Sequence, residues 1–189
     1  MKRKSKIPVI IAVWALVALV ISLSPLPQRL PLPVPQIVIA VLTLIFPLGL
    51  LFSPGLRQWT WARDLYGLTL FHLWRLIPGI VFLQLHQRQL LPRLFAVPAG
   101  WGDIIVAVTA PLAAALLLRH RWPLLLWHVL AMTELVNVVA IGAGIGFGRP
   151  TGLEPLRHFP LSLLPVFLVP LTLQAHIATI FKLLRREQY

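Results

Sequence analysis

The chain has 189 residues, of which 58% are hydrophobic and only 12% are charged. A soluble domain carries about 25% charged residues, so this chain has too few of them to cover a surface that faces water. Cysteine is absent, which excludes disulfides, thiolate metal sites and cysteine nucleophiles. The formal net charge is +12. It does not indicate nucleic acid as a partner, because the basic residues gather at the ends of apolar segments, where anionic lipid headgroups lie.

Six apolar segments each approach the ~20 residues that a helix needs to cross a bilayer. Links that contain proline and glycine separate these segments. The sequence therefore predicts an all-α fold, a polytopic membrane helical bundle of one domain with six transmembrane helices. The predicted spans are residues 7–24, 34–52, 65–87, 102–118, 122–147 and 161–184.

Lysine and arginine set the expected orientation, because the cytoplasmic loops of membrane proteins carry an excess of both. With the N-terminus inside, eleven basic residues lie on the cytoplasmic side: Lys2, Arg3, Lys4, Lys6, Arg57, Arg63, Arg119, Arg121, Lys182, Arg185 and Arg186. Five lie outside, with Arg75 left out of the count: Arg29, Arg88, Arg93, Arg149 and Arg157. We expect an integral protein of a bacterial cytoplasmic membrane with both termini cytoplasmic, in contact with anionic lipids at the cytoplasmic face.

The first 24 residues also resemble a signal peptide, because a basic start precedes an apolar core. No A-x-A cleavage pattern is present, and Pro25 would directly follow a cleavage at Ser24. We therefore expect an uncleaved first span. Cleavage would leave five spans in the same orientation.

The third predicted span carries an unusual polar face. His72, Arg75, Gly79, Phe82 and His86 recur at steps of three and four residues, so they share one side of a helix. A charge at the centre of a bilayer costs roughly 3 kcal/mol on insertion scales, which favours a protein interior and a partner. This face is expected to look into the bundle.

Glu134 is the expected partner of Arg75. Counted from the cytoplasmic ends of their spans, the two lie about twelve and ten residues in, a difference of a few ångströms at ~1.5 Å per residue. The sequence predicts an Arg75–Glu134 ion pair, with Asn137 donating to the carboxylate. One interpretation is a structural pair that sets helix register, and the other is a site that binds an anion at Arg75 or moves a proton on Glu134.

Three histidines share the cytoplasmic third of the predicted bundle: His72, His128 and His176. Two imidazoles that face each other at one depth could ligate a b-type haem. The alternative is structural, because Thr172 and Thr179 lie on the same stripe as His176 and are expected to hydrogen-bond it. No cofactor is predicted, and haem b stays open as an alternative.

Three further residues are secondary candidates: His86, Asp103 and Gln174. Asp103 follows the proline- and glycine-containing residues 98–102, so its simplest role is the N-cap of the fourth span. Its alternative role is a pair with His86 that handles protons or a metal, although two ligands are too few to define a metal site. Gln174 lies just inside a bend expected at two prolines of the last span.

Four functions follow, in decreasing order of support. The first is binding or transport of a proton, ion or small anion at His72, Arg75, Glu134 and Asn137. The second is a structural or assembly subunit that contacts a membrane protein partner or a second copy through the G-x-x-x-G spacing of 142–148. The third is a haem or quinone redox protein. An enzyme is least favoured, because the G-x-S-x-G, H-E-x-x-H and P-loop patterns are missing.

Overall fold

The computed structural model describes residues 6–31, 34–148 and 152–185, and those parts of the chain are helical with no strand. Five helical segments are long and apolar enough to cross a membrane: Val34–Phe52, Leu65–Gln87, Arg93–Leu117, Arg121–Ile145 and Leu164–Leu184. A sixth apolar helix, Ile7–Leu23, is shorter, with 17 residues. The all-α class is confirmed and a membrane bundle is supported, while the count of six spans stays a prediction.

The helices follow one another with short links. The first four are α1 (Ile7–Leu23), α2 (Leu26–Arg29), α3 (Val34–Phe52) and α4 (Pro54–Trp61). The next span comprises α5 (Leu65–Leu70), the 3-10 helix η1 (Phe71–Arg75) and α6 (Leu76–Gln87). Then come α7 (Arg93–Leu112), the π-helix η2 (Ala113–Leu117) and α8 (Arg121–Gly148). The chain ends with the 3-10 helix η3 (Glu154–Arg157), the π-helix η4 (Leu164–Leu168) and α9 (Val169–Leu184).

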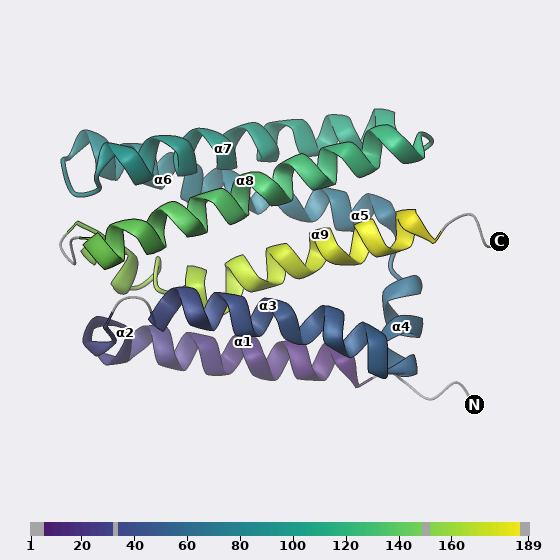
Figure 1. Ribbon diagram of the computed structural model, residues 1–189, viewed down its shortest axis with the longest axis horizontal. Helices are drawn as coiled ribbons and strands as arrows, with labels where there is room; N and C mark the ends of the chain where they lie inside the picture. The colour runs from purple at the N-terminus through teal and green to yellow at the C-terminus, as the bar shows by residue number, and fades with distance from the viewer. Residues whose placement is uncertain (1–5, 32–33, 149–151, 186–189) are drawn as a thin grey trace.

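The long helices lie side by side in a bundle (Figure 1). Helix α9 lies in the middle, where it contacts α3, α5 and α8, and α7 joins α8 to α6. Helix α1 begins and α9 ends at the same end of the bundle, where α4 also lies, and α2 lies at the opposite end (Figure 1). The buried charged and histidine side chains lie on the segments from α5 to α9.

Prolines explain the irregular start of the last span. Pro170 has no N–H, so it leaves the carbonyl of Val166, four residues earlier, without its helical donor. The indole Nε1 of Trp14 donates to that carbonyl at 2.9 Å, and its ring packs edge-on against Phe167. The bend expected at Pro165 and Pro170 is thus a π-helical segment that holds α1 against the bundle.

Helices α6 and α7 approach closely where two glycines meet. A Cβ atom added to Gly79 would lie 2.8 Å from the carbonyl oxygen of Gly100, and one added to Gly100 would lie 2.6 Å from Leu83. The predicted start of the fourth span at residue 102 is wrong, because α7 already begins at Arg93. Proline and glycine suggested a link there, but the small residues allow two helix backbones to approach.

Some predicted features lie outside the described residues. These are the basic residues Lys2, Arg3, Lys4, Arg149 and Arg186, and the surroundings of Gly146 and Gly148 in the G-x-x-x-G segment.

Alanine substitution of a glycine inside the α6–α7 contact, compared with that of a glycine outside it, tests this contact. Gly79→Ala should lower the stability of the protein in detergent by about 1–3 kcal/mol, because the added methyl group overpacks the α6–α7 contact. Gly144→Ala is the matched control, since its Cβ would meet nothing within 4 Å. Thermal unfolding should show a lower midpoint only for Gly79→Ala. Equal midpoints for both variants would contradict the close approach.

Candidate functional site

The polar face of the third span points into the bundle, as predicted. Arg75 is 1% exposed and His72 is fully buried, and Gly79 and Phe82 are buried with them. His86, at the far end of this face, is only partly buried. The short η1 helix ends at Arg75, so the cluster of polar groups lies where the 3-10 turn meets α6.

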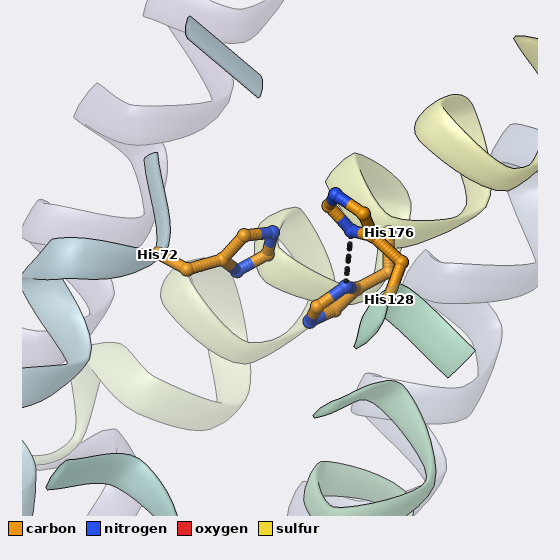
Figure 2. A group of neighbouring side chains, drawn as sticks. All are labelled: His72, His128 and His176. Carbon is orange, nitrogen blue, oxygen red and sulfur yellow. Dashed lines mark hydrogen bonds between the residues drawn. The ribbon is translucent and has the colours of Figure 1, made fainter. Parts of the chain in front are cut away.

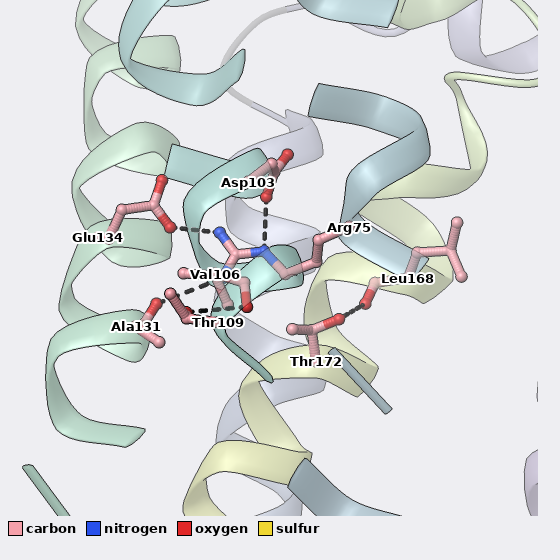
Figure 3. A network of polar contacts seen from close by, with 8 residues as sticks. All are labelled: Arg75, Asp103, Val106, Thr109, Ala131, Glu134, Leu168 and Thr172. Carbon is pink, nitrogen blue, oxygen red and sulfur yellow. Dashed lines mark hydrogen bonds and ion pairs between the residues drawn. The ribbon is translucent and has the colours of Figure 1, made fainter. Parts of the chain in front are cut away.

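Arg75 is shared between two carboxylates from different helices (Figure 3). Its Nε donates to Asp103 Oδ1 of α7 at 2.5 Å, and its Nη2 donates to Glu134 Oε2 of α8. The remaining Nη1 points to the carbonyl oxygen of Ala131 at 3.5 Å. The expected Arg75–Glu134 ion pair is present, and Asp103 completes it. We refer to Arg75, Asp103 and Glu134 as the charge cluster.

The charges in the charge cluster do not cancel when both Asp103 and Glu134 are ionised. It then holds two negative charges and one positive charge, and the side chains of Asp103 and Glu134 are only 10% and 25% exposed. Glu134 Oε1 is buried and has no hydrogen-bond partner among the described residues. An uncompensated charge in an apolar interior is costly, so this arrangement favours binding of one further positive charge.

Gly102 provides the space for Glu134. A Cβ atom at position 102 would overlap the Glu134 carboxylate, which lies directly over the α7 backbone there. The segment Pro98–Asp103 therefore builds the site in two ways. Gly100 lets α6 approach α7, and Gly102 lets the acid of α8 reach across α7 to Arg75.

The sequence-based interpretations of Asp103 and His86 are wrong. Asp103 lies well inside α7, so it is not an N-cap, and its carboxylate binds Arg75. His86 Nδ1 lies 3.2 Å from the carbonyl oxygen of Leu91 and not beside Asp103. The signal that could have identified Asp103 is its stripe of small neighbours, since Ala99, Ala107 and Ala110 on α7 are fully buried.

The predicted role of Asn137 is also wrong. Its side chain is exposed, and among the described residues it donates no hydrogen bond to Glu134. Three residues turn an α-helix by about 300°, and Glu134 already lies at the edge of the buried face, so Asn137 falls beyond that edge. Gln174 also lies outside the cluster, where its Nε2 donates to the carbonyl oxygen of Leu42 at 2.8 Å and ties α9 to α3.

A cavity of about 120 Å³ adjoins the charge cluster. Arg75 and Asp103 form part of its wall, and most of the remainder is apolar, including Phe82 and Phe95. Its lining extends to Pro27 of α2 and to residues of η3, at the end of the bundle opposite α4. The cavity thus borders the charge cluster at Arg75 and Asp103, while Glu134 is not part of its wall.

The three histidines of separate spans meet in the bundle (Figure 2). His72, His128 and His176 are all fully buried. His128 Nδ1 and His176 Nδ1 lie 3.0 Å apart in a hydrogen bond, and the rings of His72 and His176 stack with centroids 3.8 Å apart. We refer to these residues as the histidine cluster.

The hydroxyl groups expected to bind His176 do not do so. Thr172 and Thr179 donate instead to the carbonyl oxygens of Leu168 and Ala175 on their own helix. A bis-histidine haem needs a gap between two imidazoles that is wide enough for a porphyrin. The direct contacts among these three rings leave no such gap in this structure, and haem b stays an untested alternative.

Neutralising the charge cluster tests its energetics. Arg75→Met should destabilise the protein by about 3–5 kcal/mol, because it leaves two buried carboxylates facing each other without a cation. Adding Asp103→Asn and Glu134→Gln should recover much of that loss, since all three charges are then gone. Thermal unfolding of the single and triple variants in detergent measures the difference. If the triple variant loses as much stability as the three single variants together, the three residues do not interact.

Comparison with known proteins places the chain in a family. No curated protein and no solved structure matches it. Residues 32–185, which include the charge cluster and the histidine cluster, match a family described as a domain of unknown function, DUF8737. The chain belongs to the DUF8737 family.

Proposed function

We propose that this multi-pass membrane protein binds a proton at the charge cluster and carries it across the membrane. The observation that carries the proposal is the pairing of one guanidinium, Arg75, with two buried carboxylates. A proton on Glu134 or Asp103 leaves the cluster neutral, and its release leaves one negative charge. Intramembrane acids in such surroundings are typical of proton pathways.

Glu134 is the acid that we assign to proton exchange. Asp103 is bound by Arg75 Nε and is the more deeply buried of the two, whereas Glu134 keeps one oxygen without a partner. The side chain of Glu134 is 25% exposed. Binding of an anion at Arg75 is less favoured, because two carboxylates already occupy the donors that an anion would use.

The orientation proposed for this function places the α4 end of the bundle in the cytoplasm. By the helix bounds, seven of the described basic residues flank the helix ends at that side: Lys6, Arg57, Arg63, Arg119, Arg121, Lys182 and Arg185. Four flank the helix ends at the other side: Arg29, Arg88, Arg93 and Arg157. This asymmetry favours a cytoplasmic α4 end in a bacterial inner membrane. The cavity beside the charge cluster then reaches toward the outer side.

Proton flux into vesicles tests the proposal. Purified protein is reconstituted into liposomes that contain a pH-sensitive dye, and an inward pH gradient is imposed with valinomycin and potassium to balance charge. Wild-type vesicles should acidify faster than empty vesicles. Glu134→Gln should reduce the added flux at least tenfold, because the amide cannot exchange a proton.

Glu154→Gln is the matched control, since Glu154 is exposed in η3 and the chemical change is the same. An infrared titration of the same samples gives a second reading, the carbonyl band of a protonated acid that Glu134→Gln should remove. Folded wild-type protein that neither speeds acidification nor shows a titrating acid band at Glu134 would overturn the proposal. The charge cluster would then be a structural element only.

A second candidate function is assembly with another copy of the chain. Asn137 is exposed near the middle of α8, where its amide would otherwise face lipid without a partner. Ala140 and Gly144 are exposed on the same helix, and small residues beside a polar amide are typical of helix contacts in membranes. These features support a contact through α8 between two copies.

Cysteine cross-linking tests this contact cleanly, because the natural chain has no cysteine. Asn137→Cys should form a disulfide-linked dimer in membranes under mild oxidation. Ile77→Cys is the control, since Ile77 is 70% exposed on a different helix. Gel mobility measures both. Equal cross-linking at the two positions, or none at Asn137→Cys, would contradict the α8 contact.

A further inference from the structure

We propose that the histidine cluster is a binding site for one divalent transition-metal ion of the class that prefers imidazole, such as Zn²⁺. One nitrogen from each of His72, His128 and His176 lies within 4.8 Å of the other two. The three residues come from the α5–α6 span, α8 and α9, so the ion would join three helices in the interior of the bundle. This inference goes beyond proton binding at the charge cluster and does not depend on it.

The hydrogen bonds around the cluster assign its lone pairs. The Thr69 hydroxyl donates to the carbonyl oxygen of Leu65 at 2.8 Å, so it accepts from His128 Nε2–H at 3.2 Å. Neutral His128 then carries its lone pair on Nδ1, which accepts from His176 Nδ1–H at 3.0 Å. Neutral His176 therefore presents a lone pair at Nε2.

The lone pair at His176 Nε2 and both ring nitrogens of His72 have no hydrogen-bond partner in the part of the chain that the structure describes. His176 Nε2, His72 Nδ1 and His72 Nε2 are all buried without a hydrogen-bond partner among the described residues. A buried polar atom without a partner is costly, and native proteins rarely tolerate several of them together. A metal ion would satisfy the lone pairs of both rings at once.

Binding of an ion requires the imidazole rings to turn, because the His72 and His176 rings are stacked and the Nδ1 atoms of His128 and His176 face each other. Three nitrogens around a tetrahedral zinc ion at ~2.1 Å lie about 3.4 Å apart, so nitrogens separated by as much as 4.8 Å have to approach by about 1.4 Å. Binding at His128 Nδ1 would cost the His176 N–H its acceptor, and the third metal–nitrogen bond offsets that loss. Three protein ligands leave a fourth position open for water or substrate.

The ligand set and its surroundings select the class of metal. Three neutral imidazoles, with no cysteine in the chain, suit Zn²⁺, Cu²⁺ or Ni²⁺ and not the hard ions Ca²⁺ and Mg²⁺, which prefer oxygen. Thr69 orients His128 from outside the site, as the outer partners of metal-bound histidines commonly do. Trp127 packs edge-on against His128 at 4.8 Å and shields the site.

Two features favour arrival of a cation at this depth. The charge cluster, with one excess carboxylate when both acids are ionised, begins at Arg75, one 3-10 turn after His72. A groove of about 1040 Å³ also opens between α1, α3, α4 and α9, and its wall includes Leu68, Phe71 and Ala175. These three residues are direct chain neighbours of Thr69, His72 and His176, so the groove passes beside the helix turns that carry the histidine cluster.

Cobalt binding to the purified full-length protein tests the proposal. The protein is prepared with a histidine-free affinity tag, treated with chelator, and titrated with Co²⁺ in detergent. We expect one Co²⁺ per chain, with the visible absorption of a nitrogen-ligated tetrahedral site, and displacement of that absorption by Zn²⁺. Zn²⁺ should also raise the midpoint of thermal unfolding.

Matched variants separate the site from other histidines. His72→Leu and His176→Leu should each weaken Co²⁺ binding at least tenfold, and His72→Leu should stay folded because it removes two unpartnered nitrogens. His120→Gln and His158→Gln are controls, since both histidines are exposed. Glu134→Gln should still bind one Co²⁺ per chain with the same visible absorption and only a modest loss of affinity, which separates failure here from failure of the proton proposal. Absence of binding to folded wild-type protein, or unchanged binding in folded His72→Leu, would overturn the metal site.

Discussion

The sharing of Arg75 between Asp103 and Glu134 is the interaction on which this half of the bundle depends. A guanidinium buried in an apolar interior needs a carboxylate, and here the two carboxylates come from two different helices. The register of α7 and α8 relative to the third span is therefore set by the reach of three side chains. Three glycines make this possible, because Gly79 and Gly100 let α6 and α7 approach and Gly102 leaves room for the Glu134 carboxylate.

The 3-10 segment η1 joins the two polar regions of the molecule. In an α-helix, residues three apart differ by about 60° in direction, whereas in a 3-10 helix they are eclipsed. His72 and Arg75 lie three residues apart within η1, so both project from the same side of the span, where His72 meets α8 and α9 and Arg75 meets α7 and α8. This local tightening lets one helix supply a base to the histidine cluster and a cation to the charge cluster.

The two clusters have opposite chemical character. The charge cluster contains an excess of acid and adjoins a cavity, which suits exchange of a proton. The histidine cluster contains lone pairs without donors and packs against the Trp127 ring, which suits a bound ion. The excess carboxylate of the charge cluster and the free lone pairs of the histidine cluster lie within one helical turn of each other. Proton binding and metal binding are therefore expected to influence each other electrostatically.

The sequence by itself determined the class of the protein, most of the apolar spans, the inward face of His72 and Arg75, and the pairing of Arg75 with Glu134. Hydropathy, helical period and depth along a span depend only on local order in the chain. Only the tertiary structure decided that Asp103 joins Arg75, that Asn137 is exposed, and that three histidines meet. Those outcomes depend on which helices are neighbours and how each is rotated about its axis, and the packing of small residues between helices, as at Gly79 and Gly100, sets both.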